Sequence, residues 1–268
     1  MDLYYISLLA LIQGFTEFLP VSSSAHLMVL SKMSSQEGHN LQIDVSVHFG
    51  TLLALVIFFH KDVFTLLLGA KENLTGNLYT QNARFFRLLL ISTVPIFSIG
   101  FILIITNLIE VIRSVKIIGW SMVVFALFLY VSDKYGKSMR KKYDWTIKDA
   151  LFLGIWQSIA LIPGASRSGT TITGARFLGF SRVDSTSIAM LMAIPTMLGS
   201  TSILAADLLN NNYALYEVRN MIYATFFSFI VAIITLFLFF RYVKKLSFTP
   251  FVIYRLFLGF VLLYISYN

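Results

Sequence analysis

The chain has 268 residues, of which 57% are hydrophobic and 13% are charged, and its mean hydropathy is +0.77. A soluble domain carries about 25% charged residues, so this composition is typical of a protein embedded in a lipid bilayer. The chain has no cysteine, which excludes disulfides and thiolate metal sites, and its four histidines argue against a multi-histidine zinc centre.

The net charge of +8 does not indicate a nucleic-acid-binding protein, because the basic residues gather between apolar runs. Thirteen of the 21 Lys and Arg residues lie within 61–87, 133–148 and 241–249. Such concentration in short segments is the signature of cytoplasmic loops in membrane proteins. We therefore expect contact with membrane lipid and none with nucleic acid.

In chain order, the first segment, residues 1–30, is apolar but is interrupted by Gly, Pro and Ser. A second interrupted segment, 147–182, follows in the second half. Irregular backbone at membrane depth is tolerated only where it is buried in protein or lines a wet cavity. We therefore predict that both segments are re-entrant helical hairpins.

Continuous apolar runs occupy the rest of the chain, and each approaches the roughly 20 residues that span hydrocarbon as a helix. These runs are at about 41–60, 84–106, 113–132, 186–206, 219–240 and 250–267. The predicted fold is thus an all-α integral membrane protein, with about six transmembrane helices and two re-entrant hairpins in a single domain, 1–268.

Charge fixes the orientation. If segment 133–148 lies on the cytoplasmic side, counting the membrane spans in both directions places 61–83 and 241–249 on that side as well. The tails and the loops 107–112 and 207–218, which lack Lys and Arg, then lie outside. The same count makes the first hairpin enter from outside and the second from inside.

The two hairpins also resemble each other. Gln13 stands seven residues before Pro20, Gln157 stands six before Pro163, and the segments begin about 144 residues apart. Similar segments of opposite orientation are typical of an inverted repeat with a site between its halves. We place the first repeat at about 1–132, with its re-entrant part at 1–30. The second is at about 147–268, with its re-entrant part at 147–182.

A first polar cluster, residues 13–26, reads Gln-Gly-Phe-Thr-Glu-Phe-Leu-Pro-Val-Ser-Ser-Ser-Ala-His. Polar and ionisable groups inside a membrane are expensive and usually line a functional site. Gln13 and Glu17 share one helix face. Glu17 could bind a divalent cation, take a proton or cap a helix.

The serines of this cluster exceed what a helix cap needs, although one of them is expected to be an N-cap. His26 lies four residues after Ser22 and three after Ser23, so it can reach either hydroxyl around one helical turn. A hydroxyl beside an imidazole is an arrangement that activates a nucleophile.

A second polar cluster, residues 163–171, reads Pro-Gly-Ala-Ser-Arg-Ser-Gly-Thr-Thr. It predicts a turn followed by the start of a helix. The backbone N–H groups at a helix start can bind an anion, and glycine allows the ligand to approach them closely. Arg167 adds a planar fork for two phosphate oxygens. Arg167 could also pair with Glu17 in the empty protein. The substrate- and phosphate-binding candidates are Ser166, Ser168, Gly169 and Thr171 in this cluster, and Ser22 and Gln13 in the first cluster.

Weaker candidates lie elsewhere. Asp44 and His48 could support the site or simply mark a helix end, and Gln157 is expected to hydrogen-bond within the second hairpin. Three charged residues, Arg176, Arg182 and Asp184, are expected to be interfacial or loop charges.

The two polar clusters, together with residues 247–255, strongly resemble the bacterial undecaprenyl-diphosphatase family, also called bacitracin-resistance proteins, over essentially the full length. The resemblance implies a plasma-membrane enzyme, open to the extracytoplasmic side, that removes one phosphate from undecaprenyl diphosphate for cell-wall synthesis. It also implies a divalent cation, Mg²⁺ or Ca²⁺, and resistance to bacitracin, which sequesters the substrate.

Motif matching places Glu17 on the family's second acidic position, where it is the candidate metal ligand, and Ser22, Ser23 and His26 on its Ser-Ser and His positions. Ser166, Arg167, Ser168 and Thr171 match the family's phosphate-binding run. Gln13 stands where many members carry a first Glu, so Glu17 is the only carboxylate of the motif.

The preferred mechanism is metal-assisted phosphoryl transfer, with Ser23 as nucleophile and with His26 and Glu17 handling the proton. His26 as direct nucleophile is the open variant. The alternative function is a polyprenyl-phosphate flippase or transporter, which would need Arg167 but no nucleophile. The Phe-rich helices could form either a lipid-tail groove or the face of a homodimer.

Overall fold

The computed structural model describes residues 2–33, 41–108, 112, 114–209 and 213–268. Apart from one isolated bridge between Arg140 and Phe180, the elements in this part of the chain are all helical. They are α1 (Leu3–Thr16), α2 (Ser23–Met33), α3 (Leu41–Phe58), α4 (His60–Leu74), α5 (Gln81–Ile105), α7 (Val115–Tyr135), α8 (Ile147–Ser158), the 3-10 turn η1 (Ile159–Leu161), α9 (Arg167–Phe177), α10 (Arg182–Leu209), α11 (Leu215–Val243) and α12 (Thr249–Tyr267).

The prediction of an all-α multi-pass membrane protein is confirmed. Within the described residues, five helices are long and apolar enough to cross a membrane: α3, α5, α7, α11 and α12. The sixth predicted run, 186–206, lies inside α10, a 28-residue helix that contains Pro195.

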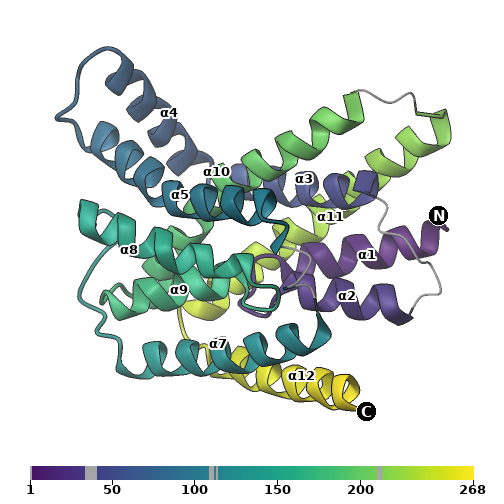
Figure 1. Cartoon of the computed structure of the whole chain (residues 1–268). Coiled ribbons are helices and arrows are strands. Elements are labelled where there is room, and N and C mark those ends of the chain that lie inside the picture. The colour runs from purple at the N-terminus through teal and green to yellow at the C-terminus, as the bar shows by residue number, and fades with distance from the viewer. Residues whose placement is uncertain (1, 34–40, 109–111, 113, 210–212) are drawn as a thin grey trace.

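The segment 61–83 differs from the loop that the charge pattern suggested. Most of it is the helix α4, which starts directly after α3 and pairs with α5. Its Leu, Lys, Ala and Glu residues are good helix formers. At Gly69 a Cβ atom would lie 2.3 Å from the Asn82 carbonyl oxygen, so glycine lets the two helices approach closely. Figure 1 shows this hairpin projecting at one corner of the molecule.

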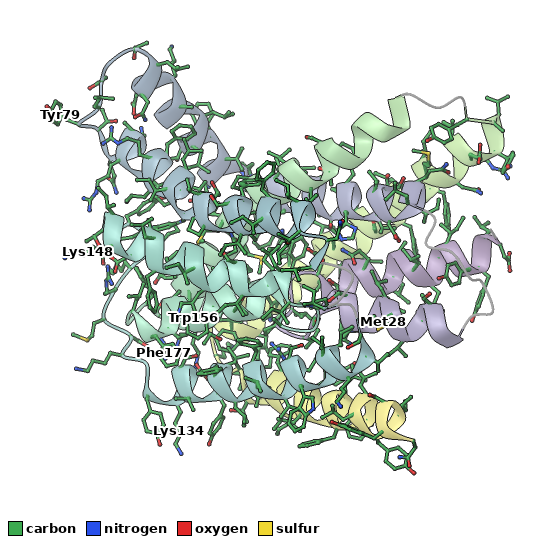
Figure 2. The ribbon with its side chains drawn as sticks, viewed as in Figure 1. Met28, Tyr79, Lys134, Lys148, Trp156 and Phe177 are labelled. Atoms are coloured by element: carbon green, nitrogen blue, oxygen red, sulfur yellow. The ribbon has the colours of Figure 1, made fainter. Side chains whose placement is uncertain are left out.

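The basic segments gather at one end of the molecule. Tyr79, Lys134 and Lys148 lie toward the same side in Figure 2, and both chain termini lie on the opposite side in Figure 1. The α11–α12 connection joins the basic end, because the Phe248 backbone N–H donates to the Asp133 carboxylate of α7 at 3.0 Å. The three basic segments therefore lie at one end of the molecule, as the charge count requires.

The two hairpins enter from opposite ends and meet in the middle. In Figure 1, α1 runs inward from the end that carries the N-terminus, and α8 runs inward from the basic end. The chain then reverses, so that α2 and α9 run back toward the ends from which α1 and α8 came. The turns that join α1 to α2 and α8 to α9 therefore face each other inside the protein.

The two hairpins share the same local structure at a spacing of 144 residues. α1 begins after Asp2 and α8 begins after Thr146, each capped by that residue's side chain. α2 and α9 are both 11 residues long and begin at positions 23 and 167. Ser22 and Ser166, directly before them, have left-handed φ values of 73° and 71°. The repeat therefore needs no gap, since Gln13 and Gln157 are also 144 positions apart.

The surroundings of the hairpins repeat as well. α1 packs on α11 and α8 packs on α5, while α7 and α12 pack against each other. A re-entrant helix of each half is thus covered by a long apolar helix of the other half. These pairings hold the two turns at the centre of the molecule.

Arg176, expected to be a loop or interfacial charge, is instead only 2% exposed. The last turn of α9 is covered by the α7–α8 connection, and the guanidinium donates to the carbonyls of Phe180, Asp133 and Gly136 at 2.6–3.2 Å. The Asp133 carboxylate lies 3.5 Å from its Nε and balances the charge. This cluster fixes the outer end of the second hairpin.

A second ion pair lies at the same basic end, outside the spanning helices. Arg140 contacts Asp149 at 2.5 Å, and Asp149 also closes a capping box with Thr146. Burial opposes ionisation, but the hydrogen bonds from Arg140 and Thr146 hold the pKa of Asp149 below its ordinary value. Its contribution to stability is therefore full above the unfolded pKa, about 4, and is lost as the pH falls through the folded value.

Gly50 tests the packing between α3 and α11. A Cβ atom there would lie 2.1 Å from Ser228 Oγ and 2.2 Å from the Thr225 carbonyl oxygen. Gly50→Ala is expected to destabilise the protein by ~1–3 kcal/mol, the usual cost of overpacking. The matched control is Gly100→Ala, where the nearest atom would be 3.8 Å away. Equal unfolding midpoints for the two variants in detergent would contradict the prediction.

Candidate active site

The two central turns contact each other directly. Ser168 Oγ, at the start of α9, donates to the Leu19 carbonyl at 2.9 Å, and the Gly164 N–H donates to Ser24 Oγ at 3.4 Å. Leu19 and Ser24 belong to the first turn and to α2. Residues far apart in sequence are therefore joined at the point where the two hairpins meet.

Glu17 and Arg167 form an ion pair across this junction. Arg167 NH2 lies 2.5 Å from Glu17 Oε1, and the two side chains are 18% and 8% exposed. Arg167 NH1 also donates to Thr196 Oγ1 at 3.2 Å. An arginine at the first position of α9 thus neutralises a carboxylate placed just after α1. The pairing considered from the sequence is present.

Ser23 contacts the same carboxylate. Its Oγ donates to Glu17 Oε2 at 2.9 Å, and Gln13 Nε2 donates to that oxygen at 2.8 Å. Ser23 is half-buried, whereas Gln13 is fully buried. A carboxylate that accepts a hydrogen bond from a serine hydroxyl is placed to take its proton. Glu17 therefore joins a hydroxyl on one side to a guanidinium on the other.

The start of α9 has the backbone features expected of an anion site. Ser166, in its left-handed conformation, precedes the helix, and its Oγ accepts from the Gly169 N–H at 3.2 Å. A Cβ atom at position 169 would lie 3.2 Å from this Oγ and 2.8 Å from Arg255 NH1, so only glycine fits without displacement. The remaining N–H groups of the first turn are free of intrahelical partners, and the helix dipole favours a negative charge there.

Not every candidate hydroxyl faces this anion site. Thr171 Oγ1 donates to the Arg167 carbonyl at 2.9 Å, within its own helix. Ser22 Oγ is 3.1 Å from Ser24 Oγ, and Ser166 Oγ is 3.2 Å from Ser168 Oγ. These two serine pairs occupy equivalent positions in the two hairpins.

His26 turns away from the Ser23 hydroxyl. Its Nδ1 lies 2.7 Å from the Ser22 carbonyl oxygen, and its Nε2 lies 2.5 Å from the hydroxyl of Tyr254 in α12. A carbonyl only accepts, so Nδ1 carries a proton, and the neutral ring accepts from Tyr254 at Nε2. Both nitrogens are thus occupied within the described residues, and His26 holds the turn at Ser22.

Comparison with known proteins decides the family. The family model described as bacitracin resistance protein BacA matches residues 6–261. A protein of Ruegeria pomeroyi is 46% identical over 268 residues, covering 100% of both chains, and one of Campylobacter curvus is 39% identical over 268 residues, covering 99% of both. Both are named undecaprenyl-diphosphatase. The chain belongs to the BacA family.

The structure of this BacA-family protein adds two residues that the sequence reasoning missed. Tyr254 and Arg255 lie in the 247–255 run that carried part of the resemblance, yet no role was assigned to them. Arg255 is fully buried in α12, a helix apolar enough to span a membrane. A charge inside an apolar span usually marks a functional site, and that signal alone pointed to Arg255.

Two weaker candidates, Gln157 and His48, form no hydrogen bond with the cluster around Glu17 within the described residues. The Gln157 amide, expected to hydrogen-bond within the second hairpin, is fully buried and has no hydrogen-bond partner among the described residues. His48 Nδ1 contacts the Asp44 backbone oxygen at 2.7 Å, a contact within α3. Neither observation gives these residues a part in the site.

Few side chains of the site could bind a divalent cation. No group of three or more His, Asp or Glu side chains that could hold a metal occurs among the described residues. However, Gln13 Oε1 is buried without a hydrogen-bond partner, beside the Glu17 carboxylate that its own Nε2 contacts. Mg²⁺ is commonly held by one or two carboxylates together with substrate phosphates and waters. The oxygens of Glu17 and Gln13 fit such a shared site.

Because both nitrogens of His26 are occupied, replacing it should cost less than replacing the Ser23 hydroxyl. His26→Gln is expected to lower phosphate release by roughly tenfold, within the range of one lost positioning interaction. Tyr254→Phe, which removes only the Nε2 partner, should cost less. His60→Gln, a change at an exposed histidine, is the control. A loss in His26→Gln as large as that in Ser23→Ala would contradict this role.

Proposed function

We propose that the protein is an undecaprenyl-diphosphatase, which hydrolyses the terminal phosphate of undecaprenyl diphosphate to give undecaprenyl phosphate. The names of the BacA-family relatives support this activity. The observation that carries it is the position of Glu17, which contacts Ser23 Oγ and Arg167 NH2 at once. A carboxylate, a hydroxyl and an arginine in one small cluster suit phosphoryl transfer.

Binding comes first. The diphosphate would be held by Arg167 and by the backbone N–H groups at the start of α9, where Ser166 and Gly169 shape the turn. When the diphosphate binds, Arg167 would exchange its contact with Glu17 for two N–H hydrogen bonds to phosphate oxygens. The ion pair of the empty protein thus keeps the arginine ready and keeps a buried charge neutral.

Two displacements follow. Ser23 Oγ attacks the terminal phosphorus, its proton passes to Glu17, and the bond to the bridging oxygen breaks, so undecaprenyl phosphate leaves. Glu17 releases this proton with the departing undecaprenyl phosphate. Water then attacks the phosphoserine, Glu17 takes a proton from the water and delivers it to Ser23 Oγ as the P–O bond breaks, and inorganic phosphate leaves with Ser23 restored. Catalysis of this kind is mostly positioning and charge stabilisation, which the fixed donors of α9 supply.

A divalent cation, Mg²⁺ or Ca²⁺, is proposed as cofactor. Glu17 and Gln13 Oε1 would hold it together with the substrate oxygens, and it would neutralise charge on the diphosphate. Chelator should abolish phosphate release, and added cation should restore it. Full activity after exhaustive chelation would contradict the proposal.

The proposed location is the bacterial inner membrane, with the site opening to the extracytoplasmic side. The basic end, including 133–148, would face the cytoplasm. Because the chain has no native cysteine, Asn268→Cys and Lys137→Cys each introduce a single thiol. A membrane-impermeant thiol reagent added to spheroplasts should label position 268 and leave 137 unlabelled.

Bacitracin would act by sequestering undecaprenyl diphosphate. A larger amount of the enzyme would convert this lipid to undecaprenyl phosphate before bacitracin binds it, which would explain resistance. A homodimer is the proposed assembly, which the mass of the detergent-solubilised protein tests. A mass equal to one chain plus detergent would contradict it.

The decisive experiment measures phosphate released from undecaprenyl diphosphate by the purified protein in detergent. The wild type should release one phosphate per lipid, and Ser23→Ala should release none above background. A protein that moves prenyl phosphates across vesicle membranes but releases no phosphate would instead favour the flippase function.

A further inference from the structure

Arg255 is a buried cation that the proposed reaction does not use. Its side chain is 0% exposed, and it forms no ion pair among the described residues. A buried charge is costly unless it is paired or fully hydrogen-bonded. Its retention in the middle of α12 therefore calls for a compensating role.

Backbone carbonyls from both central turns surround this guanidinium. NH1 donates to the Pro20 carbonyl at 3.4 Å, and NH2 donates to the carbonyls of Gly164 and Ala165 at 3.1 and 2.9 Å. Pro20 lies three residues before Ser23, and Ala165 lies two before Arg167. One side chain thus bridges the turn that carries the nucleophile and the turn that carries the anion site.

The same guanidinium lies directly behind the start of α9. The ideal Cβ position of Gly169 is 2.8 Å from Arg255 NH1. The carbonyls that it binds are dipoles, and they leave its net charge in place, whereas Arg176 at the other end of α9 is balanced by Asp133. The positive field at the start of this helix is therefore reinforced by a full charge.

We propose that Arg255 is a positioning residue that keeps the two turns in register and that its unbalanced charge strengthens anion binding at the start of α9. The inference rests on the proposed function for its catalytic part. The claim about anion binding applies to any diphosphate group, with or without a lipid tail. Arg255 touches no substrate atom, because it is fully buried behind the turn.

The test compares Arg255→Met, Arg255→Lys and the matched control Arg176→Met, another buried arginine bonded to three carbonyls. The readouts are kcat and KM for undecaprenyl diphosphate, and the Kd of inorganic pyrophosphate, measured by its stabilisation of the protein against heat. Because pyrophosphate carries no lipid tail, the second readout isolates the anion site.

Arg255→Met is expected to weaken pyrophosphate binding by roughly tenfold or more and to lower kcat as well, since both the charge and the bridge are lost. Arg255→Lys should restore pyrophosphate binding to within about threefold of wild type but leave kcat low, because an ammonium lacks the planar fork that spans two turns. Arg176→Met should lower the melting temperature and leave the pyrophosphate Kd unchanged.

Unchanged pyrophosphate binding in Arg255→Met, or an equal weakening in Arg176→Met, would overturn the inference. If Arg255→Met does not fold, Arg255→Gln replaces it, because glutamine removes the charge but can still donate to a backbone carbonyl. That variant should weaken pyrophosphate binding severalfold, and wild-type affinity would again overturn the idea. If pyrophosphate binding depends on Arg255 but the wild-type protein releases no phosphate from undecaprenyl diphosphate, the proposed function alone would be refuted.

Discussion

Replacing Arg167 by alanine is expected to lower phosphate release by ~10³-fold or more, the scale of losing an arginine that stabilises the transition-state charge in phosphoryl transfer. Arg167 is the one cation of the cluster that contacts Glu17, and it stands at the first position of α9, where phosphate oxygens would bind. The measurement is kcat/KM for undecaprenyl diphosphate in detergent.

Arg167→Lys separates charge from geometry. Lysine keeps the positive charge but offers one ammonium in place of a planar fork, so only a small part of the activity should return. Arg182→Lys, at the basic end of the molecule, is the control for folding. A wild-type kcat/KM in Arg167→Ala would contradict the assignment of the anion site to the start of α9.

Replacing Ser23 by alanine is expected to abolish turnover, because the hydroxyl bonded to Glu17 Oε2 is the attacking group. Binding should survive, since Arg167 and the start of α9 are untouched. The pyrophosphate Kd should therefore remain within about twofold of wild type while kcat falls to background.

Rapid quenching with substrate labelled in its terminal phosphate should trap the label on Ser23 in the wild type and leave Ser23→Ala unlabelled. Ser158→Ala is the matched control, because in the described part of the chain that buried hydroxyl donates to the Gly154 carbonyl of its own helix and to no other group. Label found on His26, or turnover in Ser23→Ala, would reject serine as nucleophile.

Much of the fold follows from the sequence. Apolar runs locate the spanning helices, because lipid demands about 20 continuous apolar residues. Broken runs locate the hairpins, because exposed backbone is excluded from lipid. Segment 61–83 was read as a loop, since its charges identify a side of the membrane but do not exclude a helix such as α4.

The site was predicted less completely. The Glu17–Arg167 pair was anticipated, because two opposite charges in an apolar protein stabilise each other. Spacing placed His26 within reach of two hydroxyls, but an imidazole in the first turn of a helix also reaches the carbonyl four residues earlier, and Ser22 offers that carbonyl. The contacts of Arg255 depend on how α12 packs, which spacing within either cluster does not determine.

The 144-residue spacing places Ser23 and Arg167 at equivalent positions, each one residue after a serine with left-handed φ. In a protein with two identical halves, this position would hold either two serines or two arginines. Two serines would leave the charge of a diphosphate unneutralised, and two arginines would leave no attacking group. Either ancestor of the repeat would have been a symmetric protein without this chemistry. Divergence of the two copies at this single position would give the site one atom that attacks and another that receives the charge.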